Sequence, residues 1–238
     1  PGSGGRCPGR LDLIDGMVYQ IGMTTTDPLA QKPRRGRPRA APDASQTRQA
    51  LIRAGLAHLT ERGYSSVGVD EILAGAKIPK GSFYHHFRNK ADFGLALIAA
   101  YDSYFARLLD RAFLADGPTP LERLRRFTRM AEDGMARHGF RRGCLVGNLG
   151  QEMGALPDDF RGALIAVLER WQSRTARLLR EAQACGELGA AQDPDRLAEA
   201  FWIGWEGAIL RAKLELRPDP LRSFTTTFVR LFETRTPD

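Results

Sequence analysis

The chain has 238 residues, of which 42% are hydrophobic and 26% charged, as is typical of a folded globular protein. Its three cysteines, an odd number without metal-site spacing, argue against a disulfide framework or a zinc site. No run approaches the roughly 20 apolar residues of a membrane helix. We therefore expect a cytoplasmic protein without a cofactor or metal ion.

The net charge of +7 is concentrated near the N-terminus. Residues 31–42 carry five positive side chains and no acid, which leaves only +2 for the rest of the chain. A basic segment on a nearly neutral body favours a polyanionic partner, most simply nucleic acid, and the alternative is a solubilising tail.

Residues 1–44 are expected to form a flexible segment that carries this basic arm. Residues 1–22 within it are rich in Gly and Pro and have no hydrophobic periodicity. A leader foreign to the natural protein or an over-extended reading frame would both produce such a stretch, so fold prediction sets it aside.

After this segment nearly every hydrophobic pattern has helical spacing, and no stretch alternates as a strand would. Three short helices are expected between Ser45 and Phe87, the third with Pro79 in its first position. Asn89, with Asp92 three residues later, should cap a long fourth helix. Five more helices are expected. Two lie near 121–138 and 143–156, a long one follows Pro157, one opens at Asp193-Pro194, and the last carries Leu221 to Leu231.

The third short helix carries the residues suited to DNA contact. Two short helices joined by a tight turn indicate a helix-turn-helix unit. Phe83 and Phe87, four residues apart, should face inward. The outward side chains can then contact phosphates or bases, and Lys90 can hold a flanking phosphate. The expected DNA-binding set is Lys80, Gly81, Ser82, Tyr84, His85, His86 and Lys90.

The stretch "GYSSVGVDEILAGAKIPKGSFYHHFRNKADF", residues 63–93, resembles the DNA-binding region of the TetR family of bacterial repressors. The resemblance implies an all-α protein with a three-helix DNA-binding domain at 45–91 and a six-helix effector-binding and dimerisation domain at 92–238. It also implies that Lys80, Gly81, Tyr84, His85, His86 and Lys90 contact DNA. Pro79 departs from the pattern, in which a small polar residue is frequent.

The basic arm contains "RGRPR", which resembles the minor-groove segment of AT-hook peptides. Arg35, Arg37 and Arg39 are therefore expected to enter a narrow A·T minor groove, because its negative potential attracts arginine. Deleting residues 23–42 should flatten the salt dependence of DNA binding, and an unchanged slope would contradict this role.

The segment "GCLVGNLGQEMGAL", residues 143–156, is the most informative part of the body. Cys144, Asn148 and Glu152 recur every four residues and so share one helix face, with Gln151 beside them. These polar groups could hold a small polar effector, or they could pair with neighbouring helices instead. Two interior glycines weaken this helix, which would suit a segment that moves on binding.

Aromatic and cationic side chains elsewhere could complete an effector site. Each aromatic could equally belong to the core, and a carboxylate ligand would need a cationic donor. The candidates are Tyr101, Tyr104, Phe127, Trp171, Trp202 and Trp205, with Arg107, Arg174 and Lys213 as cations. Gly204, Gly207 and Ala208 in an apolar helix, with the aromatics of the last helix, suit dimerisation, and the family resemblance implies a dimer through the last two helices.

The body resembles the subgroup of TetR regulators that respond to small electrophiles, and within it the acrylate-responsive repressors. The segments on which this resemblance rests are "GCLVGNLGQEM", "LPDDFR" and "AFWIGWEGAILRAKLELRPDPL". The resemblance implies a repressor released by acrylate or a related unsaturated acid, with covalent sensing at Cys144 as the alternative to a buried, inert thiol. An all-helical enzyme lacks any nucleophile–base or phosphate-loop motif, and an architectural DNA binder would lack an effector.

Overall fold

A computed structural model describes residues 44–231, which form nine α-helices and no strand. The predicted all-α class is therefore confirmed. The basic arm with Arg35, Arg37 and Arg39 lies outside the described residues. The helices are α1 (Ala44–Arg62), α2 (Val69–Ala76), α3 (Lys80–His86), α4 (Lys90–Phe113), α5 (Pro120–Ala136), α6 (Leu145–Gln151), α7 (Asp158–Ala184), α8 (Pro194–Glu215) and α9 (Asp219–Arg230).

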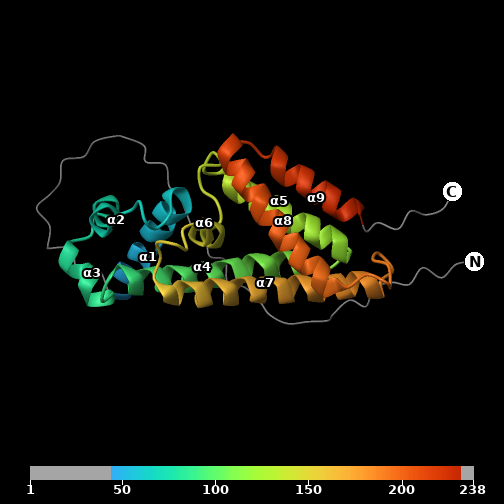
Figure 1. Ribbon diagram of the computed structural model, residues 1–238, viewed down its shortest axis with the longest axis horizontal. Coiled ribbons are helices and arrows are strands. Elements are labelled where there is room, and N and C mark those ends of the chain that lie inside the picture. Colours follow the sequence, from blue (N-terminus) through green and yellow to red (C-terminus); the bar gives the residue numbers. More distant parts are fainter. Residues whose placement is uncertain (1–43, 232–238) are drawn as a thin grey trace, which may run out of the picture.

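Helices α1 to α3 gather at one end of the molecule, where α4 begins (Figure 1). Their common core is aromatic. The ring of Phe83 lies 5.5 Å from that of Phe87 and 5.3 Å from that of Phe93, and all three side chains are buried. Offset aromatic contacts of this kind add to the burial of apolar area. The prediction that Phe83 and Phe87 face inward is confirmed.

The ends of these helices follow their capping residues. The Asn89 side chain accepts a hydrogen bond of 2.8 Å from the Asp92 N–H, so the predicted cap of α4 is confirmed. The prediction for Pro79 was wrong by one position, because α3 begins at Lys80. Pro79 has ψ 143°, an extended value, and precedes the helix as its N-cap residue. Its ring fixes φ at a value that both positions accept.

In the body, the long helices α4 and α7 run parallel and side by side (Figure 1). The contacts follow the same order along both helices: Gly94 lies against Phe160, and Asp102, further along α4, lies against Trp171, further along α7. Helices α5 and α8 cover this pair, and α9 packs on α8 and α5. Gly94 permits the close approach of α4 and α7, since a Cβ at this position would lie 2.3 Å from the Phe160 ring.

The core of the body is a cluster of large rings. Trp171 stacks on Phe105 with 4.2 Å between ring centroids, and Trp202 lies 4.9 Å from Trp171. Phe127 lies between Trp202 and Trp205, at 5.7 and 5.8 Å. All five side chains are buried. The sequence left two roles open for Phe127 and the three tryptophans, effector contact or core. In the structure they lie in the core.

Helix α8 was expected to be buried on several sides because it is apolar nearly all round. In the single chain one face stays exposed. Ile203 is 69% and Leu214 79% exposed, and Leu210 lies between them on the same stripe. Gly207 belongs to this stripe, whereas Gly204 faces Phe224 of α9, where a Cβ would lie 2.3 Å from its ring.

Candidate functional site

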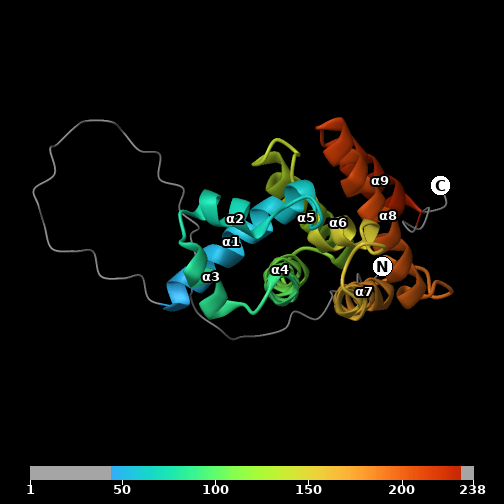
Figure 2. The same ribbon diagram turned by 60° about the vertical axis from the view of Figure 1, so that its left-hand side comes forward.

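Helix α3 lies at the end of the molecule that is remote from α8 and α9 (Figure 2). Lys80, Gly81, Tyr84 and His85 are exposed, and the Tyr84 side chain is 57% exposed. Ser82 and His86 are half-buried on the flanks of the same helix. The burial of Phe83 fixes which side of α3 faces outward, so the sequence-predicted residues share one accessible surface.

The two predicted phosphate-binding lysines differ. The Lys80 ammonium forms an exposed ion pair with Asp70 of α2 at 2.9 Å, and this hydrogen-bonded partner raises the pKa of Lys80. Lys90 instead donates a 2.7 Å hydrogen bond to the Tyr64 carbonyl and lies 4.1 Å over the Tyr64 ring. Partial burial lowers the pKa of Lys90, and the charge of Glu152 opposes that effect. Lys80 can exchange its surface partner for a phosphate, whereas the Lys90 ammonium is engaged by the carbonyl and the ring of Tyr64.

Helix α6 joins the body to the C-terminal end of α1. The Asn148 side-chain amide donates to the Leu59 and Thr60 carbonyls, at 3.0 and 2.8 Å. The Gly143 N–H donates to the Thr60 carbonyl at 2.9 Å. These carbonyls lie in the last turn of α1, where donors from the helix itself run out. Asn148 therefore acts as a cap supplied by another part of the chain.

Glu152, just after α6, contacts the loop that follows α1. Its carboxylate accepts hydrogen bonds from the Tyr64 N–H at 2.9 Å and the Ser65 N–H at 2.7 Å. Lys213 of α8 reaches the same junction and donates to the Thr60 carbonyl at 3.4 Å. Burial lowers the pKa of Lys213, while nearby Glu61 and Glu152 oppose that effect. For Asn148 and Glu152, the pairing with neighbouring elements that the sequence left open is present.

A buried polar cluster lies beside this junction. It consists of Tyr101 from α4, Cys144 at the N-cap of α6 and Glu206 from α8, and we call it the acid cluster. Burial raises the pKa of the Cys144 thiol well above its usual range, and the charge of Glu206 adds to the effect. Burial likewise raises the pKa of the Tyr101 hydroxyl. Both groups are therefore protonated at neutral pH.

Glu206 has an environment unusual for a carboxyl group. Burial raises its pKa to about 7, although a hydrogen bond with Cys144 acts in the opposite direction. Its Oε1 is buried without a hydrogen-bond partner among the described residues. Gly147 of α6 leaves room for this group, because a Cβ at Gly147 would lie 2.2 Å from the Glu206 Oε2. An unpaired buried oxygen next to a thiol and a phenol marks a place that a small polar ligand could complete.

The sequence did not identify Glu206. The available signal was an ionisable residue inside the otherwise apolar segment "AFWIGWEGAIL". Of the thirteen predicted effector residues, only Tyr101 and Cys144 belong to the acid cluster. Tyr104 and Gln151 are exposed, and Arg174 pairs with Asp110.

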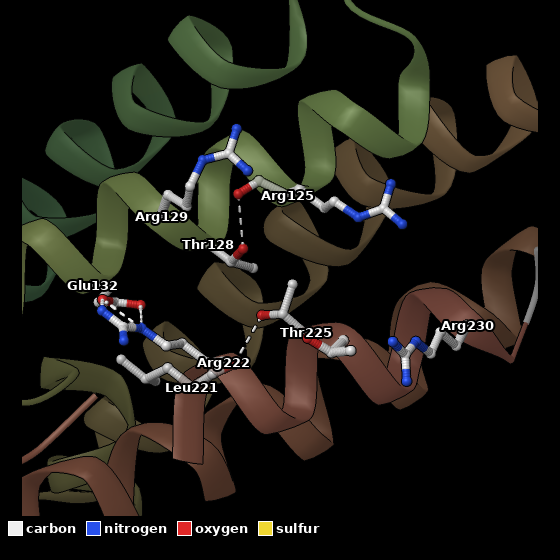
Figure 3. A pocket seen from close by; sticks show the side chains of 9 residues that line it. Arg125, Thr128, Arg129, Glu132, Leu221, Arg222, Thr225 and Arg230 are labelled. Carbon is white, nitrogen blue, oxygen red and sulfur yellow. Dashed lines mark hydrogen bonds and ion pairs between the residues drawn. The ribbon is translucent and has the colours of Figure 1, made fainter. Parts of the chain in front are cut away.

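A separate cavity of about 390 Å³ lies between α5 and α9 (Figure 3). Its lining is basic. Arg222 is held by Glu132 through three guanidinium–carboxylate hydrogen bonds, the shortest 2.6 Å, whereas Arg129 and Arg230 have no ion pair within residues 44–231. All the lining residues belong to α5 and α9, and neither helix packs extensively on the DNA-binding helices α1 to α3.

Two other kinds of site were considered for the described part of the chain. Between residues 44 and 231, no helix is long and apolar enough to cross a membrane. Over the same range, no group of histidine, cysteine or acidic side chains is arranged to hold a metal ion.

Family models match both halves of the chain. Residues 51–97 match the bacterial regulatory proteins of the tetR family, and residues 120–228 match the tetracyclin repressor-like C-terminal domain. The first range contains α2, α3 and most of α1, and the second runs from α5 to α9.

Similar proteins agree with this assignment. Transcriptional regulator AcuR of Cereibacter sphaeroides is 80% identical over 215 residues, which cover 90% of this chain and 98% of AcuR. The HTH-type transcriptional repressor DhaR of a Mycobacterium species is 35% identical, over 75% of this chain and 88% of DhaR. A crystal structure of regulatory protein TetR from Rhodobacter sphaeroides is 82% identical with a TM-score of 0.77, and covers 77% of this chain and 97% of that one.

Proposed function

This chain belongs to the TetR family of bacterial transcriptional regulators, and we propose that it is a repressor that binds operator DNA as a homodimer and is released by a small unsaturated acid. The family consists of helix-turn-helix DNA-binding regulators rather than enzymes. We propose the identity of the effector, the binding of operator DNA upstream of the gene, and repression as the sign of regulation.

DNA contact is assigned to the exposed surface of α3. Tyr84 and His85 offer donors to phosphates, Lys80 exchanges Asp70 for a phosphate, and Gly81 faces open space, since a Cβ there would meet no neighbouring atom. The basic arm, outside the described residues, would add contacts in the adjacent minor groove. Both contributions should weaken as the salt concentration rises.

Dimerisation is assigned to the exposed stripe of α8, formed by Ile203, Gly207, Leu210 and Leu214. Their spacing of four, three and four residues is that of a helix–helix contact. A two-fold axis through this stripe would place two copies of α3 on one face of the DNA. Within one chain the α9 aromatics Phe224 and Phe228 pack against Phe201 of α8, and the interface through the last two helices that the sequence predicts stays a prediction.

The effector is assigned to the acid cluster. Its groups come from α4, α6 and α8, so a ligand there would contact all three helices at once. The unpaired buried oxygen of Glu206 suits a short acid such as acrylate. Acrylate itself is suggested by the resemblance of the body to acrylate-responsive repressors. The α5–α9 cavity offers arginines, but neither of its helices packs extensively on the DNA-binding helices.

The observation that carries the proposal is the position of α6. Cys144 at its start belongs to the acid cluster, while Asn148 and Glu152 hold the end of α1 and the loop after it. A ligand that displaces α6 would therefore displace the DNA-binding domain, and with it the spacing of the two α3 helices. Such coupling typically amounts to about 1–3 kcal/mol and is reciprocal, so operator DNA should weaken effector binding by the same factor.

The test is fluorescence anisotropy with labelled DNA from upstream of the gene, at fixed salt, with and without acrylate. Specific binding that acrylate weakens would support the repressor, the operator and the effector class together. Asn148→Ala should reduce the acrylate-dependent change in DNA affinity, whereas Gln151→Ala, an exposed change next to the same helix end, should not. Equal responses in both variants would contradict transmission through α6.

Covalent sensing at Cys144 is the alternative. The raised pKa of this thiol opposes it, because the thiolate is the nucleophile. Cys144→Ser should therefore still release DNA in acrylate, and the wild-type mass should not change after exposure. Loss of the response together with a mass increase of one acrylate would favour the covalent route.

A further inference from the structure

The acid cluster offers a carboxylate ligand no positive charge among the described residues. Its members are a phenol, a thiol and a carboxyl group. Lys213, the candidate cation on the same helix, lies seven residues after Glu206, and its ammonium is directed to the Thr60 carbonyl at the junction. A bound carboxylate and an ionised Glu206 would place two like charges together in a buried site, which is strongly unfavourable.

We propose that Glu206 holds one proton when the effector binds, so that the ligand carboxylate and the Glu206 carboxyl share it through a hydrogen bond. The inference rests on the proposed function and adds to it the chemistry that recognises the ligand. Glu206 is then the group that selects an acid, and the regulator senses the acid and a proton together.

The geometry supports this assignment at two points. The Glu206 Oε1 is buried and has no partner within residues 44–231, so one oxygen is available to a ligand. The other oxygen, Oε2, occupies the space that Gly147 leaves empty, which fixes the carboxyl group against α6. A carboxyl pair with one proton satisfies both acids, as it does wherever two carboxyl groups share a buried site.

The groups that face Glu206 are few. Tyr101 approaches from α4 and Cys144 from the start of α6, and both are protonated. Helices α7 and α9 also pack on α8, and within the described chain they add no charged group that shifts the Glu206 pKa. That pKa of about 7 lies within the range in which the protein would operate. Proton binding by Glu206 is therefore decided by burial and by the ligand.

The expected result is a pH-dependent affinity for acrylate. Acrylate is ionised throughout the range from pH 6 to 8.5 because a carboxyl group titrates near pH 4. With a proton site of pKa about 7, the apparent Kd should rise about 30-fold between pH 6 and pH 8.5. Calorimetry at pH 8 in two buffers of different ionisation enthalpy should show nearly one proton taken up per effector bound.

Glu206→Gln provides the decisive variant, because its amide donates a hydrogen bond at every pH. Its Kd for acrylate should change less than threefold from pH 6 to 8.5, whereas the exposed control Glu169→Gln should keep the wild-type slope. Operator binding by each variant reports that it is folded. A flat wild-type profile, an unchanged slope in Glu206→Gln, or no proton uptake at pH 8 would each overturn the inference.

The same experiment separates this inference from the proposed function. Acrylate that binds and releases DNA with a flat pH profile would leave the repressor assignment intact and refute the shared proton alone. Acrylate that fails to bind at pH 6, where Glu206 is protonated, would refute the proposed effector and this inference together.

Discussion

The acid cluster predicts an effect of Glu206 on stability in the absence of any ligand. Burial raises the pKa of Glu206 from its ordinary value of 4.5 to about 7. The folded chain therefore binds a proton that the unfolded chain has already released between these two values. The contribution of Glu206 to the free energy of unfolding is therefore fully present below pH 4.5, and it is lost as the pH rises through 7. Glu206→Gln, which cannot ionise, removes this loss.

The magnitude follows from the shift. A rise in the Glu206 pKa from 4.5 to about 7 corresponds to about 3 kcal/mol of free energy of unfolding, most of which is lost between pH 5 and pH 8. This fraction is large against the 5–15 kcal/mol that typically stabilises a domain. The difference in stability between Glu206→Gln and wild type should therefore grow by about 2–3 kcal/mol over that interval.

The assay is urea unfolding followed by tryptophan fluorescence, at four pH values between 5 and 8 and one protein concentration, because a dimer's stability depends on concentration. Other titrating groups are common to both proteins and cancel in the difference. Glu169→Gln, an exposed change on α7, serves as the control and should run parallel to wild type. Parallel curves for Glu206→Gln and wild type would refute the assignment of a perturbed carboxyl.

Three further predictions concern other parts of the molecule. Tyr84→Phe removes one exposed hydroxyl from α3 and should weaken operator binding about five- to tenfold in anisotropy, with unchanged thermal unfolding. Gly147→Ala should destabilise the protein by about 1–3 kcal/mol in urea unfolding, because its Cβ would lie 2.2 Å from Glu206. Gly150→Ala meets open space and should instead stabilise α6 by about 0.5–1 kcal/mol. Equal effects of the two substitutions would contradict this packing. Leu214→Arg should weaken the dimer at least a hundredfold in sedimentation, because the loss of about 1.5–3 kcal/mol occurs in both copies, and an unchanged dimer would place the interface elsewhere.

Most of the fold could be predicted from capping residues, prolines and the periodicity of hydrophobic residues. Asn89, Pro120, Pro157 and Asp193 mark where helices begin, and each lies at the start of a helix in the structure. These signals are local, since a cap or a proline acts within one turn. The outward surface of α3 was predictable for the same reason, because Phe83 and its helical spacing determine which side is buried.

The partners of α6 were not predictable in this way. Asn148 pairs with carbonyls 88 and 89 residues earlier in the chain, and Glu152 with amides at a similar separation. A sequence shows that a polar residue lies on a helix face but not which backbone groups reach it through the fold. The helical spacing of Cys144, Asn148 and Glu152 therefore suggested one ligand-binding face, whereas the structure divides them between the acid cluster and the junction.

The glycines of α6 illustrate why the physical cause of a residue matters. Both were expected to weaken the helix and so to favour movement, but only Gly150 is free of neighbours. Gly147 is required by volume, because Glu206 occupies the space of its missing Cβ. A buried carboxyl group lowers stability at neutral pH, and a glycine beneath it adds to that cost. Both costs fall at the contact between α6 and α8, next to the hydrogen bonds from Asn148 to α1. A ligand that satisfies Glu206 would therefore gain its free energy at the place from which α6 positions the DNA-binding domain, so recognition and transmission depend on the same contact.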